Sequence, residues 1–233
     1  MLCDKLHFLL LAVILSKSVA GQNNKIDRIP IENFRFQDTT INGTTFSFTK
    51  LTQSKFYVLA TKAKETKIVY SKADDLVQKK DSSFQITLSN GTVKTLKNFK
   101  ESSGYFEEYE ITGLWKERGQ ILGAFRNWEE GNDFLLNVNN GDMYILATHY
   151  EFNSDRTIVA CFADTSIEAF YTSGFSLARF EGSDLQTFFN ASLAHSTITA
   201  IKWINNASCI LVEGIFTSSN EISSYNYYQL DVK

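Results

Sequence analysis

Few side chains in this sequence are of the types that carry out nucleophilic or metal chemistry. Beyond the first twenty residues it contains two histidines, His149 and His195, and two cysteines, Cys161 and Cys209. A serine hydrolase needs a nucleophile on a strained turn with a histidine within reach, and the Gly-x-Ser-x-Gly pattern of such a turn is absent. Zinc-ligand spacings and phosphate-cradling glycine loops are absent as well. We therefore predict no catalytic residue, no metal and no cofactor.

The two cysteines lie in short apolar segments that are typical of buried strands. In an oxidising compartment Cys161 and Cys209 could form one disulfide. Two separate buried thiols are an equal alternative, because free cysteine is among the most buried residue types. The sequence leaves both alternatives open.

Two acidic segments could in principle do chemistry. Trp128, Glu129 and Glu130 begin an oxygen-rich stretch whose spacing departs from that of a calcium-binding EF-hand loop. We interpret it as a solvated hairpin tip where Trp128 is a candidate contact for a protein or carbohydrate partner. The second segment, residues 107–110, is predicted to be the outer face of a strand. Paired carboxylates could also serve a glycan hydrolase, which is kept as an alternative.

Four Asn-x-Ser/Thr sequons are possible glycosylation sites if the protein comes from a eukaryote. They begin at Asn42, Asn90, Asn190 and Asn206. Residues 1–20 resemble an export signal, with an apolar run from Phe8 to Leu15 followed by small residues up to Ala20. The run is too short to span a bilayer. We therefore expect a secreted, extracellular or periplasmic protein with no transmembrane anchor.

Composition excludes one class of partner. The 233 residues have a formal net charge of −3 and an isoelectric point near 5.7, whereas nucleic-acid binding needs concentrated Lys and Arg. The hydrophobic share of 43% and the 19 phenylalanines are sufficient for one domain with a core. No linker rich in Pro, Gly or Ser divides residues 21–233.

A repeated pattern dominates the rest of the chain. The spacing of Phe84, Leu88, Asn90-Gly91 and Leu96 returns fifty residues later as Phe134, Val138, Asn140-Gly141 and Leu146. Asn-Gly between apolar runs is a strong hairpin signal, because type I′ turns need positive φ at both central residues. A second hairpin begins with an aromatic residue six positions before an apolar run, at Trp115, Phe152 and Trp203.

These patterns predict an all-β antiparallel repeat fold, propeller-like, with about four units of three or four strands. The units are placed at residues 44–100, 108–147, 148–192 and 197–233, with 29–37 as a possible strand that closes the last unit. The only helix candidate is the short polar stretch 73–80. A β-sandwich or a single β-barrel is the alternative fold.

Shape alone does not determine function. The first hypothesis is an exported, non-enzymatic binding or interaction module whose ligand is an unknown protein or carbohydrate. The alternatives are a secreted carboxylate-dependent glycan hydrolase and a barrel-type carrier of a small hydrophobic ligand.

Overall fold

In the computed structural model, the structure describes residues 31, 34–102, 104–127, 131–147, 149–162, 173–217 and 221–233. Antiparallel strands make up most of these residues, which confirms the all-β prediction. They form four sheets of three to five strands, numbered here by their place in the stack, beginning with the sheet β3-β4-β5.

The first and second sheets are built from consecutive strands. The first has the order β3-β4-β5 and the second the order β10-β9-β8-β7-β6. Their strands are β3 (Val77–Lys80), β4 (Ser83–Thr87), β5 (Val93–Lys97), β6 (Phe99–Lys100), β7 (Phe106–Trp115), β8 (Gln120–Asn127), β9 (Gly131–Asn137) and β10 (Met143–Ile145), with a 3-10 turn, η1 (Lys116–Arg118), between β7 and β8.

The third and fourth sheets follow the same meander, but the fourth also takes two strands from the beginning of the chain. Their orders are β11-β12-β13-β14 and β1-β2-β17-β16-β15. The strands are β11 (His149–Phe152), β12 (Ile158–Phe162), β13 (Ser173–Glu181), β14 (Asp184–Leu193), β15 (Ser196–Trp203), β16 (Ser208–Phe216), β17 (Ile222–Val232), β1 (Thr39–Ile41) and β2 (Thr44–Leu51).

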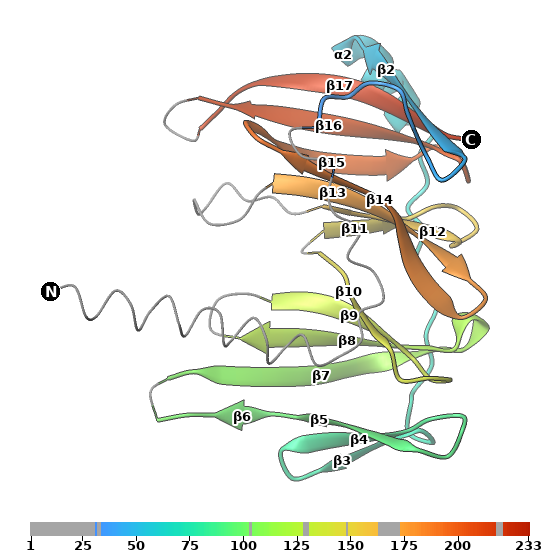
Figure 1. Ribbon diagram of the computed structural model, residues 1–233, viewed down its shortest axis with the longest axis vertical. Helices are drawn as coiled ribbons and strands as arrows, with labels where there is room; N and C mark the ends of the chain where they lie inside the picture. Colours follow the sequence, from blue (N-terminus) through green and yellow to red (C-terminus); the bar gives the residue numbers. More distant parts are fainter. Residues whose placement is uncertain are drawn as a thin grey trace, which may run out of the picture.

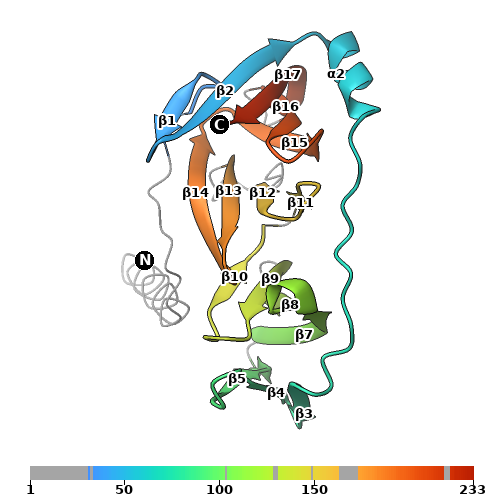
Figure 2. The same cartoon turned by 90° about the vertical axis from the view of Figure 1, so that its right-hand side faces the viewer.

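The sheets stack in one row, with the first and fourth at opposite ends (Figure 1). One apolar cluster fills each space between neighbouring sheets, and another packs helix α2 (Gln53–Ala60) on the outer face of the fourth sheet. From α2, residues 61–76 run along the side of the stack to β3 (Figure 2). The strands thus form four separate open sheets, so the alternative of one closed sheet is wrong.

The strand that pairs with β17 in the fourth sheet is β2. Of the expected closing strand 29–37, residues 29, 30, 32 and 33 lie outside the described residues, and the expectation is wrong for 31 and 34–37, which form no strand of that sheet. Phe46 of β2 pairs with Val232 of β17, and its fully buried side chain packs between the third and fourth sheets. Ile31 instead forms a parallel bridge to Ala191 at the edge of the third sheet. Residues 44–51, placed by the sequence in the first unit, therefore belong to the last one, where β2 pairs with β17 from Phe46 to Leu51.

The helix prediction is also wrong. Residues 73–76 form a turn, with the amide of Val77 donating to the carbonyl of Ala73, and residues 77–80 are strand β3. In the part of the chain that the structure describes, the α-helix is α2, which lies in the segment assigned to the first repeat unit. It begins after Thr52, whose hydroxyl caps it by accepting from the amide of Lys55 at 3.3 Å.

The hairpins at both repeated Asn-Gly pairs are present, but their turns are not type I′. Only the glycines, Gly91 and Gly141, have positive φ there. The Asn90 side chain instead accepts from the backbone amide and the hydroxyl of Thr92, at 2.9 and 2.7 Å. This side-chain turn satisfies the loop without a left-handed asparagine. The pair that does have positive φ at both residues is Asn42-Gly43, between β1 and β2.

The repeated aromatic positions end the first strand of a hairpin in three sheets, as the pattern implied. Trp115, Phe152 and Trp203 are 0%, 3% and 2% exposed. Trp115 makes edge-on contacts with Phe152 and Phe180 at centroid distances of 5.4 and 5.6 Å, which join the second and third sheets. Edge-on aromatic pairs of this kind contribute about 1 kcal/mol beyond the area they bury.

Hydrogen bonds between turns tie the sheets together along one edge of the stack, named here the turn edge. It consists of residues 42–43, 88–92, 116–119, 138–142, 153–157, 182–183 and 204–207, beside the C-terminus, on the right in Figure 1. The amide of Ser89 donates to the carbonyl of Val138 at 2.8 Å, and Asn153 Nδ2 donates to the carbonyl of Asn206 at 2.8 Å.

Candidate functional site

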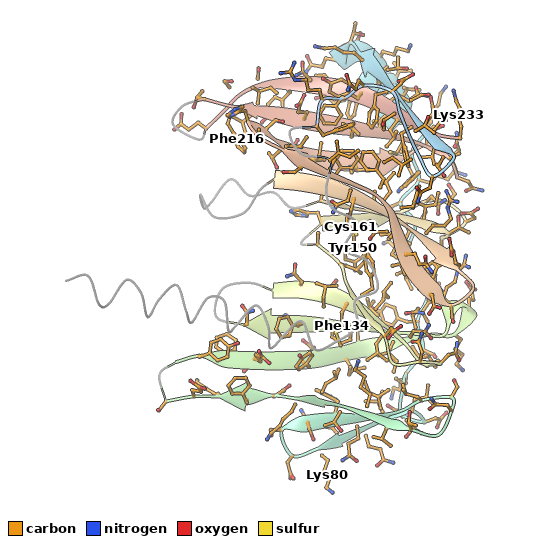
Figure 3. The ribbon with its side chains drawn as sticks, viewed as in Figure 1. Lys80, Phe134, Tyr150, Cys161, Phe216 and Lys233 are labelled. Atoms are coloured by element: carbon orange, nitrogen blue, oxygen red, sulfur yellow. The ribbon has the colours of Figure 1, made fainter. Side chains whose placement is uncertain are left out.

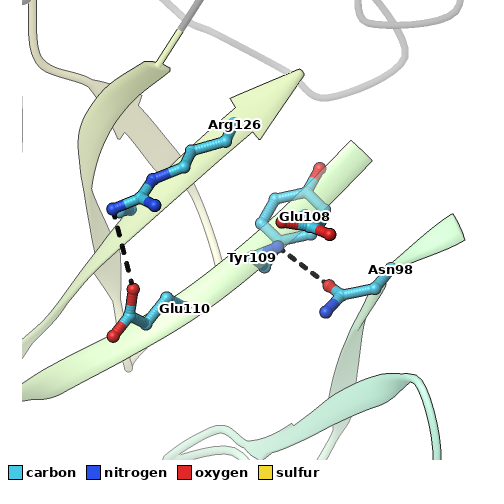
Figure 4. Close-up of a pocket in the computed structure, with 6 residues that line it drawn as sticks. Asn98, Glu108, Tyr109, Glu110 and Arg126 are labelled. Atoms are coloured by element: carbon cyan, nitrogen blue, oxygen red, sulfur yellow. Dashed lines mark hydrogen bonds and ion pairs between the residues drawn. The ribbon is translucent and has the colours of Figure 1, made fainter. Parts of the chain in front are cut away.

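A shallow depression of about 160 Å³ lies on the second sheet, near the end of β7 that is remote from the turn edge (Figure 4). Polar and charged side chains line most of it. The lining residues are Asn98, Glu108, Tyr109, Glu110, Ala124 and Arg126.

The register of the β7–β8 hairpin places these groups together. Glu108 pairs with Arg126 and Glu110 pairs with Ala124, so all four side chains lie on one face of the sheet. Glu108 and Glu110 alternate with Tyr109, whose ring packs on the other face within the cluster between the first and second sheets. The alternation therefore gives β7 one charged and one apolar face.

The charges of this site are open to solvent. Arg126 Nη2 lies 3.9 Å from Glu110 Oε2, and the two side chains are 64% and 71% exposed. Exposed pairs of this length contribute roughly 0 to 1 kcal/mol. A charged ligand could therefore compete for either partner at low cost.

Beside the depression, the outer edge of β7 is only partly paired. The short strand β6 pairs with Phe106 and Glu107, and Ser71 exchanges two backbone hydrogen bonds with Leu114. Between these points the amide of Tyr109 donates to the side chain of Asn98 at 2.8 Å. Within the described part of the chain, no strand pairs with the outer edge of β7 over residues 108–113.

Tyr109 is one of the residues that line the depression, and its ring anchors this part of β7 in the cluster between the first and second sheets. Burial, with a smaller contribution from the charge of Glu107, raises the pKa of Tyr109 above its usual value. Its ring packs against Phe125 at a centroid distance of 5.1 Å. The phenol therefore remains neutral near pH 7 and contributes shape and a polar tip rather than charge.

The candidate contact residues Trp128, Glu129 and Glu130 lie outside the described residues. In sequence they follow Asn127, the last residue of β8, and so come directly after the strand that carries Arg126. The prediction that residues 107–110 are the outer face of a strand holds for Glu108 and Glu110, which are exposed. Glu107 is half-buried and accepts from the Tyr105 hydroxyl at 2.9 Å.

The histidines and cysteines do not assemble. His149 and His195 are both exposed: His149 begins β11 of the third sheet, where its ring stacks on Phe162 at a centroid distance of 5.2 Å, and His195 lies in the connection between β14 and β15. Cys161 and Cys209 are free, buried thiols in two different apolar clusters. Figure 3 shows Cys161 close to Tyr150, which packs against the cluster between the second and third sheets. Burial raises the pKa of Cys161 to about 12 and raises the pKa of Cys209 as well, so neither thiol is activated as a nucleophile.

Sequence reasoning missed the depression. Residues 107–110 were recognised as a charged strand face, but their relation to Arg126 and Asn98 depends on hairpin register and on the position of the first sheet. The one signal in the sequence was the hairpin that follows Trp115, which brings the basic residue Arg126 opposite the alternating acidic residues Glu108 and Glu110.

Within the described ranges, no group of three or more His, Cys, Asp or Glu side chains could hold a metal ion, and no helix is long and apolar enough to cross a membrane. Comparisons with protein-family models, with curated proteins and with solved structures give no match to this chain.

Proposed function

We propose that this protein is an exported, non-enzymatic binding module that takes an extended polypeptide segment with basic side chains along the outer edge of β7. The observation that carries the proposal is the depression with Glu108 and Glu110 beside an incompletely paired strand edge.

A peptide that adds a strand to β7 would use both the incompletely paired edge and the two glutamates beside it. Peptides that extend a sheet gain affinity from main-chain hydrogen bonds and specificity from alternate side chains. Glu108 and Glu110 are two residues apart, which is about 6.6 Å along a strand. The alternate side chains of an extended peptide have the same separation, so Lys or Arg at every second position would match both carboxylates.

The other functions have less support. A glycosidase needs one carboxyl group with a raised pKa to donate a proton, which usually comes from burial. Both glutamates of the depression are exposed, and Glu110 lies beside Arg126. The hydrophobic carrier was predicted for one closed sheet, whereas the described strands form four open ones.

Export rests on the sequence of residues 1–20, which lie outside the described residues. A solvated peptide-binding edge is compatible with an extracellular location, and N-terminal sequencing of the exported product tests it. A product that begins near Gly21 supports cleavage, whereas an intact Met1 on a cytoplasmic product contradicts export.

Binding can be tested by NMR titration of the purified, 15N-labelled protein with two synthetic decapeptides that differ only in Lys or Glu at every second position. We expect the Lys peptide to shift the amide resonances of residues 108–113, and added salt to weaken the effect. Absence of a shift, or equal shifts with both peptides, would contradict the proposal. Shifts produced instead by a neutral oligosaccharide would identify a carbohydrate partner.

A charge-neutralising variant sharpens the test. Glu108→Gln combined with Glu110→Gln should abolish the Lys-peptide shifts while leaving the rest of the spectrum unchanged. The matched control is Glu181→Gln, at an exposed residue of β13 in the third sheet, which should bind as the wild type does.

A further inference from the structure

Three of the four sequons lie on the turn edge. Asn42 belongs to the β1–β2 turn, Asn90 to the β4–β5 turn and Asn206 to the β15–β16 turn, and all three are exposed. Backbone hydrogen bonds of the C-terminal residues connect the β1–β2 and β15–β16 turns. The amide of Val232 donates to the carbonyl of Ala207 at 2.8 Å, and the amide of Thr45 donates to the carbonyl of Lys233 at 2.9 Å.

The side-chain amide nitrogens of these asparagines are not needed for the local fold. Asn42 is held by its backbone, with a φ of 48° in the turn. Asn90 and Asn206 use their side-chain oxygens: Asn90 accepts from Thr92, and Asn206 accepts from the amide of Asp155 at 3.1 Å. A substituent on Nδ2 at each position can therefore extend into solvent without breaking a turn.

Asn190 is in a different environment. It lies within strand β14, pairs with Ser176 of β13 and is half-buried. The hydroxyl-bearing residue of its sequon, Ser192, is only 6% exposed. The carbonyl of Asn190 accepts from the amide of Ile31 at 3.0 Å, so the chain before β1 also covers this strand. A glycan here would have to displace packed strands.

We infer that Asn42, Asn90 and Asn206 carry N-linked glycans in the folded protein and that Asn190 does not. In each transfer, Nδ2 forms a bond to the anomeric carbon of a lipid-diphosphate-linked oligosaccharide, the bond from that carbon to the diphosphate oxygen breaks, the lipid diphosphate leaves and the amide loses one proton. The inference rests on the export part of the proposed function and applies to export through a eukaryotic secretory pathway.

The sugars would then lie on the edge opposite to the proposed binding site. Glu108 is seven residues from Trp115, at the turn end of β7, which corresponds to about 23 Å along the strand. Glycans on the turn edge would leave the outer edge of β7 near the depression accessible. The turn edge would thus carry the sugars, and the outer edge of β7 would bind the peptide.

The test is translation of the full-length chain in the presence of microsomes, with protease protection to score translocation and glycosidase digestion to score sugars. Each of Asn42→Asp, Asn90→Asp and Asn206→Asp should remove one glycosidase-sensitive mobility step. Aspartate retains the turn preferences of asparagine and lacks the acceptor nitrogen. Asn190→Gln should remove none, and Asn140→Asp, in an exposed turn without a sequon, is the mobility control.

The outcomes separate the inference from its basis. A protected chain without glycosidase-sensitive steps, or a protected chain that loses a step with Asn190→Gln, overturns the inference. A chain that remains accessible to protease refutes export, and the inference with it. Thr44→Ser should keep the glycosidase-sensitive mobility step of Asn42, and Thr44→Ala should lose it. This pair of variants shows that the step depends on the hydroxyl residue of the sequon rather than on the turn.

Discussion

Replacement of Asn137 by alanine should weaken the junction between the second and third sheets. Asn137 is 3% exposed at the end of β9. Its Nδ2 donates to the carbonyl and the hydroxyl of Ser183, at 3.1 and 3.2 Å, and to Asp184 Oδ1 at 2.6 Å. Its Oδ1 accepts from the amide of Asn139 at 2.8 Å. One side chain therefore links the β9–β10 turn to the β13–β14 turn.

The expected loss follows from these bonds. A hydrogen bond to a charged group contributes about 1.5 to 3 kcal/mol and a neutral one about 1 kcal/mol. Asp184 is exposed, so water replaces part of its bond and the low end of the range applies. The two bonds to Ser183 share one hydrogen of Nδ2 and count as one neutral bond, and water can replace the bond from the exposed Asn139 amide. The total loss of unfolding free energy for Asn137→Ala is therefore about 2.5 kcal/mol. In a chain of this length it should lower the Tm by about 5 to 10 °C.

The assay is urea and thermal unfolding followed by circular dichroism, with Asn139→Ala as the matched control. Asn139 is exposed and donates one side-chain bond, to the Ser183 hydroxyl at 3.0 Å, so its loss should cost about 0.5 kcal/mol or less. A loss below about 1 kcal/mol for Asn137→Ala, or one no larger than that of the control, would refute the view that this side chain joins the sheets.

Three further predictions concern packing and ionisation. Gly123→Ala should destabilise the fold by about 2 kcal/mol, because the added Cβ would lie 2.3 Å from Phe134 Cζ, whereas Gly131→Ala, with its nearest atom at 3.5 Å, should not; chemical unfolding compares the two. Both buried thiols should resist a thiol reagent in the native state at pH 8 and react only on unfolding; fast native labelling would contradict their burial. Burial and the nearby Glu213 raise the pKa of Tyr228 to about 12, so its contribution to stability is present below pH 10 and is lost as pH rises through 12. Tyr228→Phe should flatten the dependence of unfolding free energy on pH over that interval, and an unchanged slope would show that this phenol is not responsible.

Local sequence patterns determined much of this fold. The alternation of apolar and polar residues identifies strands because it has the two-residue period of a pleated sheet. The aromatic residue before each hairpin, as at Trp115 and Trp203, became a core position for the same reason. The hairpins around Asn90 and Asn140 were likewise predictable, although their turns close through the asparagine side chains.

Pairing between distant segments could not be predicted from local patterns. Whether residues 44–51 join the first or the last unit depends on which sheet can bury Phe46, and only the C-terminal strand β17 provides that partner. The segment of α2 has the apolar content of a strand, but it forms a helix because Thr52 caps it and the outer face of the fourth sheet buries Phe56.

The candidate sites divide in the same way. The sequence by itself determined the residue types: two cysteines beyond residue 20, four sequons and an acidic strand face. Only the tertiary structure decided that the cysteines are in separate clusters, that Asn190 is packed while three other sequons are exposed, and that Arg126 and Asn98 meet Glu108 and Glu110. The physical reason is that side-chain chemistry is local, whereas burial, strand register and free edges arise when distant segments compete for the same apolar surface.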